Sequence, residues 1–283
     1  MASFVHGEHR IAYTEHGEGE GEHVVVLIHG LLFNQKLMTP LATHLGRRGY
    51  RVVTMDLLGH GGSDRPREMW KYSMTAFGEQ VIGLLDHLGV DEAVVGGLSL
   101  GANTALEAAA LAPDRVKGLI VEMPVLDHAL IGCAVAFTPL VIGLTFGEPV
   151  LRAVAAVTRR IPTRPGPADV ALDWIRQDPR PSAALLQGLF FARVAPPGAV
   201  RRTLPQPTLI IGHRRDPIHP FTDAGMLADE LERGRLVEAA SILEMRVAPK
   251  RLTGEVKQFL EEIWPPEAGA PPKRRRRASS PAA

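Results

Sequence analysis

The residues with the clearest chemical meaning lie around Ser99, in the segment Gly97-Leu98-Ser99-Leu100-Gly101. An apolar run at 93–96 precedes this segment, and a helical pattern over 100–111 follows it. A sharp turn from strand to helix exposes the serine oxygen, and glycines two residues to either side avoid clashes with neighbouring backbone. The first N–H groups of the helix point toward an oxyanion that forms beside the serine. The spacing therefore predicts a nucleophile at Ser99; a serine that only caps the helix is the alternative.

The elements that must hold this turn alternate between short apolar runs and helical patterns, which is typical of a mostly parallel sheet flanked by helices. The predicted strands are 23–28, 51–55, 93–96, 118–121, 208–212 and 235–238, with a weaker antiparallel pair at 3–6 and 10–15. The predicted helices are 35–48, 75–88, 100–111 and an amphipathic one that starts at Pro249. The sequence therefore predicts an α/β fold.

The alternation stops between Pro124 and Arg202, where prolines are frequent and helix-compatible apolar residues dominate. We assign residues 1–123 and 203–264 to an α/β core, 124–202 to an inserted helical cap and 265–283 to a disordered basic tail.

One part of this cap, residues 129–147, contains no charged residue, and Pro139 and three glycines interrupt it. We interpret this stretch as a pair of buried or pocket-facing helices broken at Pro139. Peripheral contact with a membrane or an acyl chain is the alternative, and a transmembrane helix is disfavoured.

Three segments, in this order and at this separation, resemble landmarks of the α/β-hydrolase superfamily. They are His29-Gly30-Leu31, Asp56-Leu57-Leu58-Gly59-His60-Gly61-Gly62-Ser63-Asp64 and Gly97-Leu98-Ser99-Leu100-Gly101. The resemblance covers roughly residues 3–264, and such proteins usually carry a cap where 124–202 lies. It implies an α/β-hydrolase fold whose oxyanion hole consists of the backbone N–H groups of Leu31, or Leu32, and Leu100. It also implies a structural turn at 56–64, without a direct catalytic role for His60.

The resemblance also implies a catalytic acid after the strand that follows the cap. Asp216 matches this position, with a turn-forming aspartate before Pro217 as the alternative. Its role would be to orient an imidazole and to stabilise the positive charge that develops there. Some proteins of this fold carry the acid after the preceding strand, and Asp127 is the candidate there.

The histidine of the superfamily normally lies in the loop after the last strand, where this sequence has Ser241 or Ile242. Neither side chain can accept a proton near neutral pH, and no histidine follows His219. Three interpretations remain. His219 reaches the serine from the acid's own loop, or His128, next to Asp127, descends onto it from the cap. Otherwise the site lacks a conventional base, and the protein is a weak enzyme or a ligand-binding relative.

Composition narrows the classes of function further. The net charge of +1 provides no general attraction to nucleic acids, although the basic run Lys273–Arg277 could touch nucleic acid or an anionic membrane. The single cysteine, Cys133, fits a reducing compartment, and the first ten residues carry no secretory signal, so we expect a cytoplasmic protein. Metal-binding motifs and phosphate loops are absent, and the glycine-rich segment Gly17–Gly21 is acidic. We therefore expect no metal and no cofactor.

The sequence thus predicts a serine hydrolase that cleaves an ester or similar acyl bond of a small hydrophobic substrate. The hydrophobic substrate is inferred from apolar cap residues, namely Phe137, Leu140, Phe146, Phe190 and Phe191. A carbon–carbon hydrolase and a cofactor-free haloperoxidase are compatible with the same residues. The competing class is a binding protein that holds a small apolar ligand without turning it over. The natural substrate and the oligomeric state are not predicted.

Overall fold

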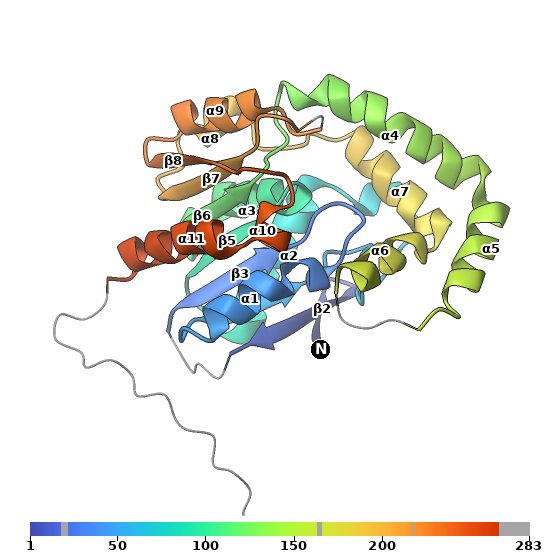
Figure 1. Cartoon of the computed structure of the whole chain (residues 1–283), viewed down its shortest axis with the longest axis horizontal. Coiled ribbons are helices and arrows are strands. Elements are labelled where there is room, and N and C mark those ends of the chain that lie inside the picture. Colours follow the sequence, from blue (N-terminus) through green and yellow to red (C-terminus); the bar gives the residue numbers. More distant parts are fainter. Residues whose placement is uncertain (18–21, 163–165, 217, 266–283) are drawn as a thin grey trace, which may run out of the picture.

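The computed structural model of the 283-residue chain describes residues 1–17, 22–162, 166–216 and 218–265. Its centre is an eight-stranded sheet with the order β1-β2-β4-β3-β5-β6-β7-β8 (Figure 1). The strands are β1 (Ala2–His6), β2 (His9–His16), β3 (Val24–Ile28), β4 (Arg51–Met55), β5 (Ala93–Leu98), β6 (Val116–Glu122), β7 (Thr208–Gly212) and β8 (Gly234–Glu238). β1 and β2 form the predicted antiparallel hairpin at one edge, and β3 to β8 are parallel. The predicted mostly parallel α/β sheet is confirmed.

Helices cover both faces of the sheet. α2 (Met74–Leu88), α3 (Leu100–Leu111) and α9 (Phe221–Glu230) pack on one face, whereas α1 (Thr39–Gly46) and α11 (Lys250–Ile263) pack on the other. β3 is buried along its whole length between these layers, as its uninterrupted apolar sequence requires. Short helical turns complete the core: η1 (Gln35–Met38), η2 (Met69–Lys71), η3 (Pro113–Arg115) and α10 (Glu244–Val247).

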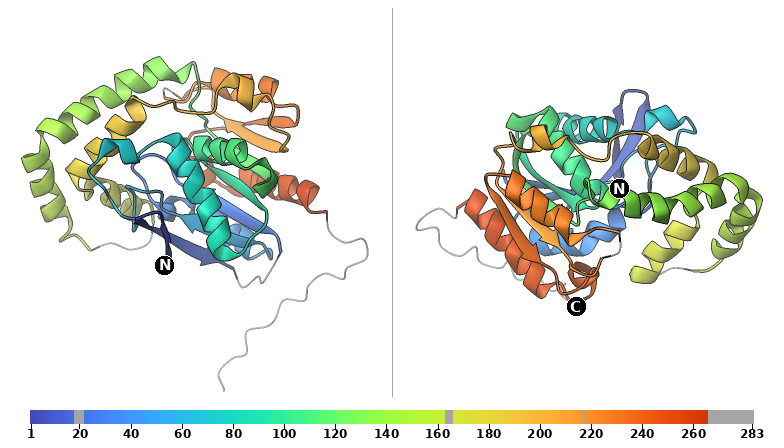
Figure 2. Two further views of the ribbon diagram at one scale, coloured as in Figure 1. Left: turned by 180° about the vertical axis from the view of Figure 1, so that it is seen from behind. Right: turned by 90° about the horizontal axis from the view of Figure 1, so that it is seen from above.

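Between β6 and β7, where the sequence predicts the cap, the described residues form five helices. They are α4 (Ala129–Phe146), α5 (Glu148–Thr158), α6 (Pro167–Ile175), α7 (Pro179–Phe190) and α8 (Gly198–Arg201). α4 and α5 form the outer rim of this insertion, and α7 and α6 lie between that rim and the sheet (Figures 1 and 2). Two predicted features, the basic tail from residue 266 onward and most of the acidic glycine-rich loop, fall outside the described residues.

The prediction of two helices broken at Pro139 is wrong, because α4 runs without a break from Ala129 to Phe146. A proline inside a helix removes one N–H donor and leaves the carbonyl four residues earlier without its partner. Here that carbonyl belongs to Val135, and both residues are exposed, so water can satisfy it. One face of α4 lines a pocket, as predicted, but the opposite face is exposed instead of buried.

Candidate active site

Ser99 occupies a strained turn between β5 and α3, with φ of 53° and ψ of −110°. This left-handed value is unusual for a residue with a side chain and costs roughly 1–3 kcal/mol. Its amide donates to the carbonyl of Glu122 on β6 (2.9 Å), and its carbonyl accepts from the amide of Asn103 (3.0 Å). A Cβ atom at Gly101 would lie 2.3 Å from the carbonyl oxygen of Ile28, so only glycine fits there. Backbone crowding at the turn therefore explains the glycine spacing on its helical side.

His219 brings an imidazole to this serine from the loop between β7 and α9. Its Nε2 lies 2.9 Å from Ser99 Oγ, and its Nδ1 lies 2.8 Å from Asp216 Oδ2. An ionised carboxylate can only accept, so Nδ1 carries the proton and donates it to Asp216. Nε2 is then free to accept a hydrogen bond from the hydroxyl of Ser99. The three side chains form a continuous serine–histidine–aspartate chain of hydrogen bonds.

Asp216 is held in place by its own loop. Its Oδ1 accepts hydrogen bonds from the amides of Ile218 (2.9 Å) and His219 (3.0 Å). Burial raises the pKa of Asp216, but the hydrogen bonds from His219 and from the amide of Ile218 outweigh that effect and lower its pKa below the ordinary 3.8. The carboxylate is thus ionised at neutral pH, which is the state needed to stabilise a protonated imidazole.

The alternative acid and base, Asp127 and His128, are engaged elsewhere. His128 Nδ1 lies 2.9 Å from Oδ1 of Asp223, and Asp127 Oδ2 accepts from Arg201 at 3.0 Å. Asp223 is fully buried and also accepts hydrogen bonds from the amides of residues 126, 128 and 129. These contacts fix the start of the cap against α9, and they account for Asp127 and His128 without a contact to Ser99.

His29 and His60, which lie in the 29–31 and 56–64 segments that resemble the superfamily, have structural roles. His29 is buried, donates from Nδ1 to the carbonyl of Gly30 (2.8 Å) and accepts from the amide of Leu57 at Nε2 (3.2 Å). His60 is buried and donates from Nδ1 to the carbonyl of Leu58 (3.1 Å). Burial lowers the pKa of both imidazoles, so both are neutral at pH 7.

The two backbone amides expected to form an oxyanion hole belong to Leu100 and to Leu31 or Leu32. Leu100 is the first residue of α3, so its N–H has no acceptor within the helix. Leu31 lines the same cavity as Ser99 and Leu100. Leu32 has a left-handed φ of 59°, and its carbonyl accepts a hydrogen bond from Gln177 in the cap. The cap therefore holds the loop that carries one of the two candidate donors.

A cavity of about 350 Å³ opens onto Ser99 between the core and the cap. Its walls are mostly apolar, with Leu31, Leu100, Leu130, Phe137, Leu186 and Phe190 among the lining residues. Within the described part of the chain no charged side chain lines it. The side-chain NH2 group of Asn103 donates hydrogen bonds to the carbonyls of Val125 and Val194 (2.6 Å each). Burial, together with the nearby acidic residues, raises the pKa of the lining residue Cys133 to about 11, so its thiol stays neutral.

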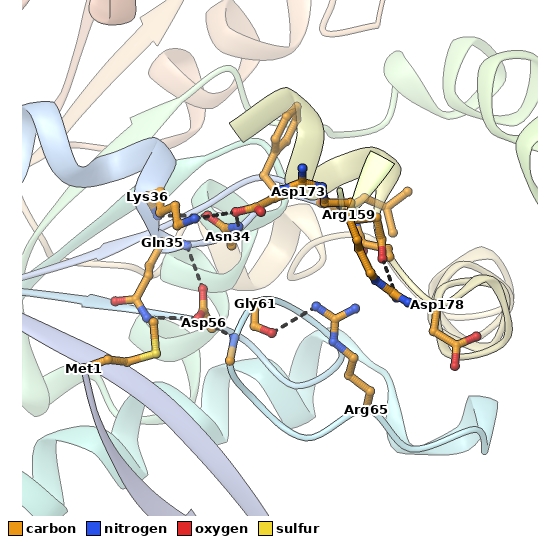
Figure 3. Close-up of a pocket in the computed structure, with 15 residues that line it drawn as sticks. Met1, Asn34, Gln35, Lys36, Asp56, Gly61, Arg65, Arg159, Asp173 and Asp178 are labelled. Carbon is orange, nitrogen blue, oxygen red and sulfur yellow. Dashed lines mark hydrogen bonds and ion pairs between the residues drawn. The ribbon is translucent and has the colours of Figure 1, made fainter. Parts of the chain in front are cut away.

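A larger hollow of about 480 Å³ lies on the other side of the 31–33 loop, and Ser99 does not line it (Figure 3). Most of its lining residues are polar or charged, and ion pairs cross it from core to cap. Lys36 pairs with Asp169 (2.8 Å) and Asp173 (2.7 Å), and Asn34 donates to Asp173 (2.9 Å). Among the described residues that line this hollow there is no nucleophile with a base, so we assign it to holding the cap on the core.

Sequence reasoning missed several residues that support the site. Glu122, buried beneath the serine turn, accepts two hydrogen bonds from Arg246 (2.7 and 2.9 Å). Asp223 and Gln177 fasten the cap, as described above. None of these residues belongs to a recognisable motif, and the partner of each lies far away along the chain. The sequence therefore carries no signal that singles them out.

The order of the strands, the serine turn after β5 and the helical insertion after β6 define the chain as a protein with the α/β-hydrolase fold. Comparisons with known proteins agree. A family model described as alpha/beta hydrolase fold matches residues 23–137. The enol-lactonase from Burkholderia xenovorans LB400 superposes with a TM-score of 0.75 at 22% identity, covering 92% of this chain and 99% of the other.

Sequence relatives include enzymes. The 2-hydroxymuconate semialdehyde hydrolase of Pseudomonas putida is 28% identical over 239 residues, which span 78% of this chain and 80% of the relative. An uncharacterised protein of Mycobacterium tuberculosis is 35% identical over 116 residues, which span 41% of this chain. That match spans 32% of the mycobacterial protein, about a third of its length. The chain thus resembles hydrolases over most of its length and the mycobacterial protein over a shorter segment.

Proposed function

We propose that this protein is a serine hydrolase that cleaves an ester or similar acyl bond. The observation that carries the proposal is the position of His219, whose Nε2 lies 2.9 Å from Ser99 Oγ while its Nδ1 lies 2.8 Å from Asp216. A serine hydroxyl is a weak nucleophile unless a base accepts its proton. The base that the superfamily places after the last strand is here supplied from the loop of the acid.

The reaction follows from this arrangement. His219 Nε2 takes the proton of Ser99 as Oγ attacks the substrate carbonyl, and Asp216 stabilises the imidazolium. The amides of Leu31 and Leu100 donate hydrogen bonds to the oxyanion. The imidazolium then gives its proton to the departing alcohol, which leaves an acyl group on Ser99. Water, activated by the same imidazole, attacks this acyl group and releases a carboxylic acid.

The cavity at Ser99 favours a neutral, apolar acyl group. Its lining is mainly aliphatic and aromatic, and no cationic side chain among the described residues could pair with a carboxylate on the substrate. Lactones are cyclic esters, so the structural similarity to an enol-lactonase is compatible with this proposal. Carbon–carbon bond hydrolysis is the second candidate, because the Pseudomonas putida relative that covers most of the chain is a semialdehyde hydrolase.

The experiment is labelling with a fluorophosphonate, followed by mapping of the adduct by mass spectrometry. We expect the label on Ser99, its loss in Ser99→Ala and His219→Ala, and its retention in His128→Ala. Hydrolysis of p-nitrophenyl esters from acetate to octanoate then measures the preference for acyl length. A folded wild-type protein that neither takes the label nor hydrolyses any ester is a ligand-binding protein and contradicts the proposal. Loss of labelling in His128→Ala alone assigns the base to the cap instead.

A further inference from the structure

Helix α4 is apolar on every side. One face lines the cavity at Ser99 through Leu130, Cys133, Ala134, Phe137 and Val141. The opposite face consists of exposed Ile131, Val135, Ile142 and Phe146. The 18 residues of α4 have a mean hydropathy of 2.1, yet only 6% of them are buried. A helix with this composition is normally covered on all sides, either by protein or by lipid.

Exposed apolar residues also lie on the next helix and at the end of α7. On α5 they include Val150, Val154 and Val157, and at the end of α7 they include Phe191. α4 and α5 together form the outer rim of the cap (Figures 1 and 2). We call the exposed residues Ile131, Val135, Ile142, Phe146, Val150, Val154 and Val157 the outer cap face. Isolated exposed apolar residues are common, but a surface that covers two consecutive helices indicates an interaction site.

Charges at the edge of this face indicate which partner fits it. α4 carries no charged residue, and the exposed Arg160 lies two residues after the end of α5. Arg159 instead lines the polar hollow and donates to the carbonyl of Arg176 (3.2 Å), and Arg152 lies 3.4 Å from Asp178. The acidic residue of α5, Glu148, pairs with Arg152 (2.9 Å) and Arg180 (2.7 Å). An apolar helix face with a cationic edge is characteristic of helices that lie in the interface of an anionic membrane.

We propose that the outer cap face binds the surface of a bilayer that contains anionic lipids. In this arrangement α4 lies in the plane of the interface instead of spanning the membrane, because its inner face forms a wall of the cavity and packs on the core through Phe137, Leu140, Val141 and Leu144. Docking itself does not depend on the chemistry at Ser99. If the proposed hydrolase activity holds, α4 is the wall between the bilayer and the serine, and apolar substrates would be drawn from the lipid phase.

The test is flotation of the full-length protein with vesicles of phosphatidylcholine alone and of phosphatidylcholine mixed with phosphatidylglycerol. Val135→Asp is the test variant, and Val5→Asp is its matched control, because the two valines are 72% and 73% exposed and Val5 lies on the edge strand β1. We expect Val135→Asp to bind vesicles about tenfold more weakly and Val5→Asp to bind like the wild type. We expect Arg160→Gln to bind the vesicles that contain phosphatidylglycerol about fivefold more weakly and to bind phosphatidylcholine alone like the wild type.

Thermal unfolding of each variant shows that it is folded, and hydrolysis of a soluble ester checks the active site separately. Unchanged ester hydrolysis with weakened vesicle binding supports docking by the outer cap face, whether or not Ser99 proves to be the nucleophile. Equal vesicle binding by Val135→Asp and Val5→Asp overturns the proposal. So does binding that disappears only when the basic run Lys273–Arg277 is replaced by glutamines. A wild-type dimer that Val135→Asp dissociates, without vesicle binding, assigns the face to a second copy of the chain.

Discussion

Replacing Asp216 by asparagine tests the proposed base most sharply, because the surrounding hydrogen bonds determine how the new amide must lie. Asp216 Oδ1 accepts two backbone amides, at 2.9 and 3.0 Å, so the carbonyl oxygen of an asparagine has to take that position. The NH2 group then faces His219 Nδ1, where the aspartate oxygen lies at 2.8 Å. An amide NH2 can only donate, so Nδ1 must become the acceptor.

This change moves the proton of His219 to Nε2, the atom that lies 2.9 Å from Ser99 Oγ. Nε2 then donates to the serine and can no longer accept its proton. The reverse orientation of the asparagine would set its NH2 group against two backbone N–H groups and leave them unpaired, at about 1–3 kcal/mol each. We therefore expect kcat/KM to fall roughly 10³- to 10⁴-fold. This decrease corresponds to a loss of about 4–5.5 kcal/mol of transition-state stabilisation.

The measurement is the rate of fluorophosphonate labelling together with kcat/KM for p-nitrophenyl butyrate. Asp127→Asn is the control, because that carboxylate pairs with Arg201 and has no contact with the serine; we expect its activity to stay within about threefold of wild type. Thermal unfolding should show that both variants are folded. A folded Asp216→Asn protein that keeps more than a third of the wild-type activity would refute this account of the site.

Three further predictions concern stability and substrate selection. Gly101→Ala places a methyl group 2.3 Å from a backbone carbonyl of β3, so urea unfolding should show a loss of about 3 kcal/mol, whereas Gly254→Ala, in open space on α11, should gain up to about 1 kcal/mol. Burial keeps His29 and His60 neutral, so the unfolded chain binds protons more readily below pH 6.5. Stability should therefore fall with decreasing pH, by about 1.4 kcal/mol per unit from His60, and urea midpoints of wild type and His60→Gln at pH 7.5 and 5.5 measure the contribution of His60. Ala134→Phe fills part of the 350 Å³ cavity, so the ratio of kcat/KM for octanoate over acetate esters should drop about tenfold; an unchanged ratio would mean that the acyl chain binds elsewhere.

The sequence by itself predicted most of the core. β4 and β7 begin and end at the predicted residues, and α3 covers 100–111 as expected. These elements can be predicted from the sequence because continuous β-branched runs specify buried parallel strands, and because the serine turn tolerates only certain residues at fixed spacing. Local sterics and local hydrophobicity were sufficient for both. The resemblance to the superfamily, together with the predicted strand at 208–212, indicated Asp216 as the acid.

Only the tertiary structure distinguished between the candidate bases. His128 and His219 each lie close in the sequence to an aspartate, Asp127 and Asp216 respectively. Ser99 lies 120 positions before His219, and no local pattern shows which of the two imidazoles approaches it. The structure directs His128 to Asp223, 95 positions away, and His219 to Ser99. The continuity of α4 also depended on tertiary structure, because water at an exposed turn can satisfy a carbonyl that would otherwise end the helix. Short-range chemistry can be read along the chain, whereas long-range hydrogen bonds and solvent exposure depend on how the whole chain packs.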